Sequence, residues 1–408
     1  MRRRSRTICL AMALCSAGAC GFDEVVLRDL PSSVPNDGGT GPEGSPVIVV
    51  EGGAIGTSFG VYAGQYFTCL LASGVGHCWG SNVLGALGTG DLASHLTPAR
   101  IAGGVVFEAL AAGEAHTCGL ERTTARVFCW GSGAAGQLGL GDKVSQSTPH
   151  VVPLSAGAAH ISVGYNHSCA VLVDGSLWCW GANFEGELGQ NDRANSDDIA
   201  SPSRVGTDSD WMMAAGGQGH TCGVRRPGSL WCWGRNGTDE LGLGAGSALQ
   251  VRTPTRVGAF ADFTQLDAGQ NHSCALRADG SLWCWGRMNG TAIDDVPTRV
   301  GTDTDWRSVS TDVFATCGIK AVDQLHCWGR NDEGQLGLGD TTARSGPTQV
   351  APGTRWASAA VGRFHTCAET IDHVVRCTGA GENGQLGLGD TARRSEFTAV
   401  VVPAPTAQ

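Results

Sequence analysis

HSCAVLVDGSLWCWG, residues 167–181, is the stretch that decides the fold. Two short apolar segments flank Asp174-Gly175, a dipeptide typical of tight β-hairpin turns, and each segment carries one cysteine. Residues 177–180 are apolar on both faces, which fits a strand buried between two neighbouring sheets. Because nothing in the stretch has the 3.6-residue periodicity of a helix, the pattern predicts antiparallel strands in an all-β protein.

Paired cysteines of this kind recur seven times along the chain. The pairs are Cys69 and Cys78, Cys118 and Cys129, Cys169 and Cys179, Cys222 and Cys232, Cys274 and Cys284, Cys317 and Cys327, and Cys367 and Cys377. A glycine or aspartate stands five residues before each first cysteine, and in six units a proline stands twenty residues before it. Seven copies of a unit of roughly fifty residues indicate a repeat architecture. We therefore expect a seven-bladed β-propeller in residues 46–408.

Each pair can form a disulfide within its own unit. Cys169 and Cys179 flank a tight turn and should lie nearly opposite each other on adjacent strands, within disulfide reach. A zinc site is the alternative, because five histidines stand two residues before a first cysteine. They are His116, His167, His220, His272 and His365. Phe67 and Ala315 replace this histidine in two units that keep both cysteines, which favours one disulfide per blade over a metal. We expect the histidines to be core residues that bind nearby loop backbone.

The first residues of the chain resemble a bacterial lipoprotein signal. Arginines come first, the apolar run 8–14 follows, and small residues precede Cys20, which would be acylated. The sequence thus predicts a signal peptide in residues 1–19, lipidation of Cys20, and a flexible tether in residues 20–45 that is rich in Gly, Pro and Ser. Ordinary secretion with cleavage after Ala19 is the alternative. Either route leads to the oxidising compartment that disulfides need, such as the cell envelope.

Composition argues against several classes of function. A formal net charge of −10 disfavours a phosphate-binding surface, so no nucleic-acid partner is expected. No hydrolase, metalloprotease or phosphate-loop motif occurs. Three charged pairs interrupt the repeat, and each fits a solvated loop better than a catalytic centre. They are Glu121-Arg122, Asp197-Asp198 and Asp294-Asp295. We expect a monomer that is not an enzyme, uses no cofactor or metal, and reaches a membrane only through a lipid anchor.

The order of short motifs resembles the repeat of the regulator-of-chromosome-condensation family. The unit reads G-x-x-H-T/S-C, D-G-x-L, C-W-G, G-Q-L-G-L-G-D and then P-x-x-V, from Pro46 to about Val402. The resemblance implies a seven-bladed propeller, but no exchange-factor motif of the founding nuclear member can be matched here. The favoured hypothesis is an exported propeller that binds a protein or an envelope polymer through loops on one face. A secreted lyase or hydrolase, and a structural envelope or adhesion protein, remain as alternatives.

The chain carries one P-x-x-V-like strand too many for seven blades. Residues 46–49 begin like the inner units, and residues 397–400 occupy the same place after the last loop. An open sheet edge is a liability, so we expect the two chain ends to share a blade. Thr398–Val402 is predicted to complete the blade of Cys69 and Cys78.

Overall fold

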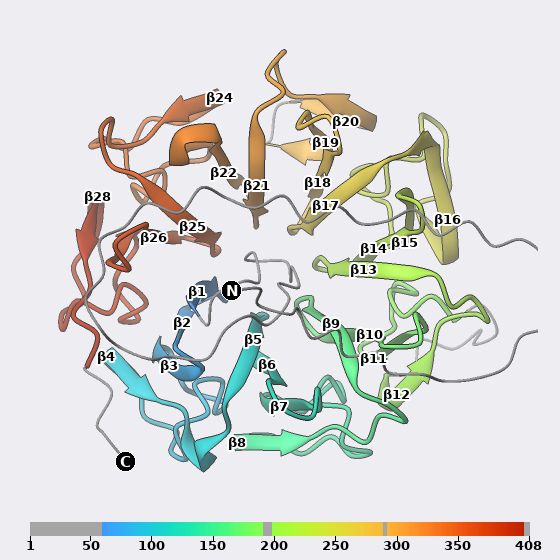
Figure 1. Cartoon of the computed structure of the whole chain (residues 1–408), viewed down its shortest axis with the longest axis horizontal. Coiled ribbons are helices and arrows are strands. Elements are labelled where there is room, and N and C mark those ends of the chain that lie inside the picture. Colours follow the sequence, from blue (N-terminus) through green and yellow to red (C-terminus); the bar gives the residue numbers. More distant parts are fainter. Residues whose placement is uncertain (1–58, 191–197, 289–291, 404–408) are drawn as a thin grey trace, which may run out of the picture. The chain divides into compact units, whose positions relative to one another are not determined.

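The computed structural model describes residues 59–190, 198–288 and 292–403 of the chain. Pro46–Val50 and Cys20 lie outside these residues. Seven four-stranded antiparallel sheets follow one another along the sequence and surround a central axis (Figure 1). Each sheet is one blade, and its four strands come in chain order from the axis to the rim. The predicted all-β propeller with seven blades is therefore confirmed.

Within a blade, the strands are consecutive in the sequence. The innermost strands are β1 (Phe59–Ala63), β5 (Phe107–Ala112), β9 (Ala158–Val163), β13 (Trp211–Gly216), β17 (Phe263–Ala268), β21 (Trp306–Thr311) and β25 (Trp356–Val361). The second strands are β2 (Phe67–Ala72), β6 (His116–Glu121), β10 (His167–Leu172), β14 (His220–Arg225), β18 (His272–Arg277), β22 (Ala315–Lys320) and β26 (His365–Thr370).

The outer half of each blade carries the remaining strands. The third strands are β3 (Val75–Gly80), β7 (Val127–Gly131), β11 (Leu177–Gly181), β15 (Ser229–Arg235), β19 (Leu282–Met288), β23 (Gln324–Gly329) and β27 (Val375–Gly379). The outermost strands are β4 (His95–Arg100), β8 (Gln146–Val151), β12 (Ile199–Arg204), β16 (Gln250–Ala261), β20 (Ala292–Arg299), β24 (Arg344–Gln349) and β28 (Arg394–Ala399). Two short 3-10 turns, η1 (Ala102–Gly104) and η2 (Ala321–Asp323), complete the elements. Proline suits an outermost strand, because an edge residue needs no second ladder partner.

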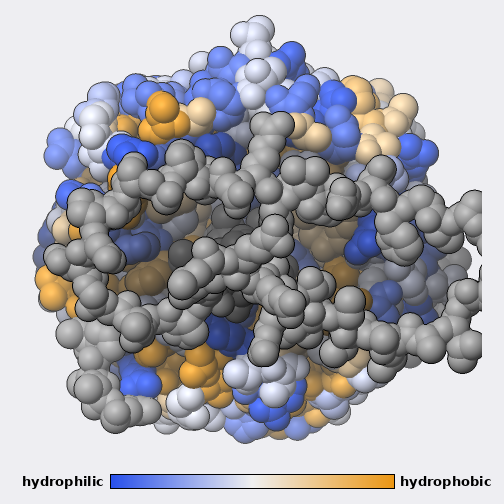
Figure 2. Space-filling view, in the orientation of Figure 1, coloured by the Kyte–Doolittle hydropathy of each residue, from blue (hydrophilic) through white to orange (hydrophobic). Residues whose placement is uncertain are grey.

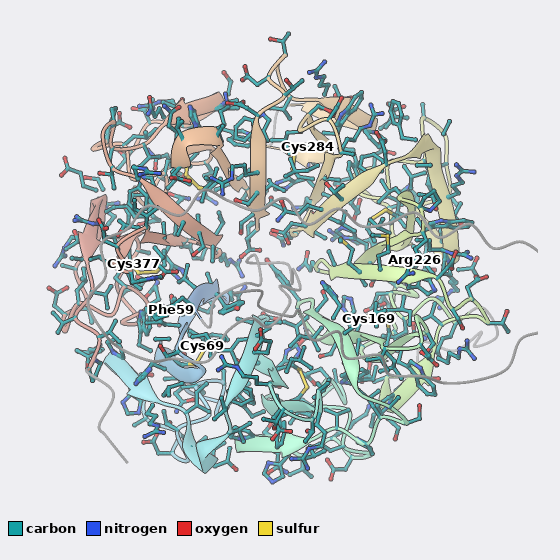
Figure 3. All side chains as sticks on the ribbon, viewed as in Figure 1. Phe59, Cys69, Cys169, Arg226, Cys284 and Cys377 are labelled. Carbon is teal, nitrogen blue, oxygen red and sulfur yellow. A yellow bond between two sulfur atoms is a disulfide. The ribbon has the colours of Figure 1, made fainter. Side chains whose placement is uncertain are left out.

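A disulfide joins the second and third strands of every blade (Figure 3). Cys169 lies directly opposite Cys179 in the ladder, with their Cα atoms 4.1 Å apart. The other six disulfides have the same register and join Cys69 to Cys78, Cys118 to Cys129, Cys222 to Cys232, Cys274 to Cys284, Cys317 to Cys327 and Cys367 to Cys377. The predicted pairing within each unit is therefore confirmed.

The core lies between blades rather than within them. One cluster combines Val61, Leu70 and Trp79 of the first blade with Cys367 and Leu386 of the seventh. The tryptophan of each Cys-Trp-Gly segment is at most 2 % exposed, as expected for a strand covered on both faces. Burial of both sheet faces explains why strands such as residues 177–180 read as continuous apolar runs.

The prediction for ring closure was wrong. Strand β28 pairs with β27, with Thr398 opposite Cys377 and Ala399 opposite Arg376, so it completes the seventh blade and not the first. Each P-x-x-V strand comes after the long loop of its blade and pairs with the third strand of that same blade. Among the described strands, none of the seventh blade pairs with a strand of the first, so these two blades meet through side chains and loops.

Candidate binding face

The two ends of the strands form two different faces of the propeller. Turns between first and second strands, such as Gly64–Tyr66, lie at the same end as the long loops after third strands, such as residues 81–94. We call this end the loop face. The opposite end, the hairpin face, carries the tight turns between second and third strands, such as Ser73–Gly74. The visible side of the propeller in Figure 2 mixes hydrophilic areas with separate hydrophobic patches.

The glycine-rich loops on the loop face connect each blade to the next. The carbonyl of Gln137 accepts hydrogen bonds from Trp180 Nε1 and Ser168 Oγ of the following blade, both at 2.9 Å. Equivalent carbonyls accept the same two bonds at four other blade junctions. They belong to Ala86, Glu187, Glu240 and Gln385. The repeated part of these loops therefore holds the scaffold together.

The five histidines extend the same network. His167 Nε2 lies 2.8 Å from Thr221 Oγ1 of the next blade, and the other four make the matching contact. Because the Thr221 hydroxyl donates its proton to the Glu187 carbonyl, His167 Nε2 must donate to the Thr221 oxygen. Burial lowers the pKa of His167 to about 3, so the imidazole is neutral near pH 7. The partner is a hydroxyl group and not the loop backbone that we expected, and the cysteine sulfurs are bonded to each other rather than available to zinc.

One position of the inner turns differs from blade to blade. It immediately precedes the histidine position and holds Tyr66, Ala115, Asn166, Gly219, Asn271, Phe314 and Phe364 in blades one to seven. Aromatic residues therefore occupy the adjacent blades six, seven and one, and small or polar residues occupy the others. A scaffold built of repeats does not require this asymmetry, so the aromatic side marks a candidate binding region.

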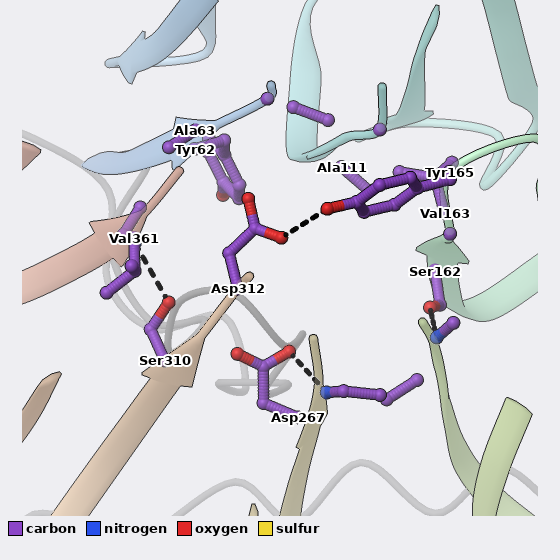
Figure 4. A pocket seen from close by; sticks show the side chains of 18 of the residues that line it. Tyr62, Ala63, Ala111, Ser162, Val163, Tyr165, Asp267, Ser310, Asp312 and Val361 are labelled. Atoms are coloured by element: carbon purple, nitrogen blue, oxygen red, sulfur yellow. Dashed lines mark hydrogen bonds between the residues drawn. The ribbon is translucent and has the colours of Figure 1, made fainter. Parts of the chain in front are cut away.

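A cavity of about 90 Å³ lies on the axis, lined by residues from all seven innermost strands or the turns after them (Figure 4). Asp267, Asp312 and Glu114 contribute carboxylates to it. The Tyr165 hydroxyl donates to Asp312 Oδ1 at 3.1 Å. Asp267 accepts hydrogen bonds from the backbone N–H groups of Thr311 and Ala268, at 2.6 and 2.9 Å.

The cavity carboxylates are half-buried. Burial raises the pKa of Asp312 to about 7, with repulsion from Asp267 adding to it and Tyr165 and Arg363 opposing it. Burial likewise raises the pKa of Asp267 to about 6, against its backbone hydrogen bonds. Perturbed carboxylates in a concave site are typical of functional positions.

Asp312 occupies a position that is glycine in the other six blades. A Cβ atom added to Gly164 or Gly217 would come within 2.2 Å of the imidazole of His167 or His220 in the same turn, and within 2.5 Å of a backbone carbonyl of the next blade. In blade six Ala315 replaces that histidine, which removes the closer of the two contacts for the side chain of Asp312. The two departures from the repeat are thus coupled, and together they put a carboxylate into the cavity. Sequence reasoning noted both residues but missed this coupling, as well as Asp267 and Tyr165.

The charged pairs singled out in the sequence do not meet in this cavity. Glu121 binds Arg126, and Arg122 binds Glu108 at 2.9 Å. Lys143 lies 2.8 Å from Asp198, while Asp197 is outside the described residues. Asp294 and Asp295 belong to the outermost strand of the fifth blade. No helix in the described part of the chain is long and apolar enough to cross a membrane.

Comparison with known proteins gives a consistent result. The family model of the "Regulator of chromosome condensation (RCC1) repeat" matches residues 125–171, 174–224, 227–276 and 323–368, and a second model of this repeat matches residues 158–187 and 263–290. The ultraviolet-B receptor UVR8 of Arabidopsis thaliana is 28 % identical over 238 residues, which are 53 % of this chain and 52 % of UVR8. The human E3 ubiquitin-protein ligase HERC2 is 27 % identical over 40 % of this chain and 4 % of its own length. The chain thus spans about half or less of these relatives.

Solved structures agree on the fold. Prp20p of Saccharomyces cerevisiae, described together with its binding to Gsp1p and histones, superimposes with a TM-score of 0.72 at 22 % identity, over 84 % of this chain and 87 % of its own. Human WBSCR16 gives a TM-score of 0.72 at 20 % identity, over 81 % and 95 % of the two chains. At these identities the likeness concerns the fold alone.

Proposed function

Because the chain belongs to the regulator of chromosome condensation (RCC1) repeat family, we propose that it is an exported binding protein that recognises another protein through its loop face. Yeast Prp20 is known in complex with Kap60, which supports protein binding as a use of this scaffold. A disulfide in each of seven blades suits an oxidising, extracellular environment. The signal-like residues 1–19 and Cys20 support export with a lipid anchor.

The asymmetry of the inner turns carries the proposal. The position before the histidine varies among the seven blades. Its aromatic residues lie on three consecutive blades. Aromatic side chains dominate the energy of protein interfaces because they bury a large area with few rotatable bonds. A purely structural envelope protein or an enzyme would not require this arrangement.

A pull-down with matched variants tests the proposal. The tagged, exported protein is used to recover partners from envelope extracts, in its native form and as Tyr66→Ala/Phe364→Ala. The control is Val173→Ala/Val322→Ala, which alters two hairpin-face residues that are 66 % and 69 % exposed. We expect one partner to be recovered by the native protein and the control but lost with the aromatic pair. Loss with the control alone would place binding on the hairpin face and contradict the proposal.

A further inference from the structure

Two concave features of the loop face adjoin each other. The axial cavity and a groove of about 290 Å³ share Gln65 and Glu114 in their linings. The groove continues outward past Tyr66 to Val83 and Leu84, which are 72 % and 43 % exposed. A partner that fills the groove would therefore reach the mouth of the cavity.

Tyr66 lines the groove, and a second aromatic ring lies beside it. Tyr66 and Phe364 have ring centroids 6.1 Å apart, and the Arg363 guanidinium lies 5.0 Å from the Phe364 ring.

The charges of the cavity lining are all of one sign. Glu114, Asp267 and Asp312 line it, and no lysine or arginine is among the lining residues. Gln65, in the amide orientation that satisfies both neighbours, donates to Glu114 Oε1 at 3.0 Å and accepts from Arg363. With Arg363 counted, three carboxyl groups stand against one guanidinium at the mouth. Complementarity therefore favours a positively charged group.

We propose that the cavity mouth is a socket for a lysine or arginine side chain of the partner protein, with an apolar residue of the same segment in the groove between Tyr66 and Leu84. This inference rests on the proposed function and names its chemistry. An ammonium or guanidinium group suits a cavity of about 90 Å³, which is too small for a whole peptide.

The socket has a protonation signature. Asp312 faces Tyr165, Asp267 and Arg363, the Glu114 carboxylate lines the same cavity, and the neutral His272 lies behind Thr311. A cation entering the socket stabilises the ionised carboxylates, so binding near pH 7 should release protons from them. Calorimetry in buffers with different ionisation enthalpies measures the net release.

Peptide selection provides the test. A random peptide library displayed on phage is selected on the exported, full-length protein, and one selected peptide is synthesised. We expect Lys or Arg beside an aliphatic or aromatic residue. Affinity should fall about tenfold or more in Asp312→Asn and in Glu114→Gln, but not in Asp372→Asn on the hairpin face. Both variants keep a hydrogen-bond acceptor, so we expect them to fold as the native protein does.

The outcomes separate this inference from the proposed function. The socket is overturned if the selected peptides are acidic or uncharged, if no peptide is selected, or if basic peptides bind both carboxylate variants as well as the native protein. If the selected peptides nevertheless compete with the partner and do not bind Tyr66→Ala/Phe364→Ala, the loop face remains the binding face. Selected peptides that ignore the aromatic pair contradict the proposed function as well.

Discussion

Thr68 and His365 are 297 residues apart in the sequence, yet Thr68 Oγ1 lies 2.8 Å from His365 Nε2. Thr68 Oγ1 also donates to the carbonyl of Gln385 at 2.9 Å. These bonds join the first blade to the seventh. They repeat the contacts between other neighbouring blades, such as His167 with Thr221. Within the described residues, the ring is therefore closed by the ordinary blade-to-blade contact and not by a shared strand.

Replacing Thr68 by valine should weaken this junction. Thr68→Val keeps the shape but leaves the buried His365 Nε2–H group without an acceptor. An unsatisfied buried group costs about 1–3 kcal/mol, so the free energy of unfolding should fall by this amount in urea titrations with the disulfides intact. Thr68→Ser is the control and should stay near native stability. Equal stability of the valine and serine variants would show that the bond contributes nothing.

Local sequence could predict the blade but not the junctions between blades. Cysteine spacing and the Asp174-Gly175 turn determine which strands pair within a unit, because hairpin register is a local property. A P-x-x-V strand can pair with the third strand before it or belong to the unit after it, and the two choices look alike in the sequence. The structure decides through Thr398, which lies opposite Cys377. The position of the Asp312 side chain in the cavity could not be predicted from local sequence either, because it depends on the absence of a histidine at Ala315.

Buried neutral histidines should make the fold sensitive to acid. Burial lowers the pKa of His365 from its ordinary value of 6.5 to about 3. Between about pH 6.5 and pH 3 this histidine is therefore protonated in the unfolded chain but not in the native chain. The free energy of unfolding consequently falls as the pH drops through this range. Each such histidine adds about 1.4 kcal/mol per pH unit to the slope in that window. Urea titrations at pH 7, 6, 5 and 4 measure the slope.

A phenylalanine variant isolates the contribution of one histidine. His365→Phe copies the residue that the first blade already has at Phe67. It should reduce the slope of unfolding free energy against pH by the contribution of about one proton. It should also lower stability at pH 7, because it removes the partner of Thr68. An unchanged slope would mean that His365 does not carry the effect.

The coupling between Asp312 and Ala315 can be tested by restoring the repeat. Ala315→His alone should crowd the Asp312 side chain and destabilise the protein. Asp312→Gly/Ala315→His removes the conflict and gives Thr366 Oγ1, which is buried without a partner among the described residues, an imidazole donor. The double variant should therefore be more stable than Ala315→His alone, yet lose the binding of basic peptides. A double variant less stable than Ala315→His alone would refute the coupling.

Lipidation at Cys20 predicts two results in cells. Labelled fatty acid should be incorporated into the native protein, and Cys20→Ala should move the protein from the membrane fraction to the soluble fraction. A single acyl chain binds membranes only marginally, so a second chain or contact would strengthen the effect. Ser32→Ala, in the expected tether, is the control. Equal solubility of native protein and Cys20→Ala would favour ordinary secretion after Ala19.

Removing strand β28 should loosen the last blade. Truncation after Arg393 deletes the outermost strand of the seventh blade, leaving Val375–Gly379 with an open edge and removing Phe397 from its contact with Trp356, whose ring lies 5.0 Å away. We expect a lower melting temperature and faster hydrogen exchange in Trp356–Gly379 than in the native protein. The third blade, Ala158–Arg204, is the internal reference and should exchange at the native rate. Faster exchange confined to Phe59–Gly80 would instead show that the chain end supports the first blade.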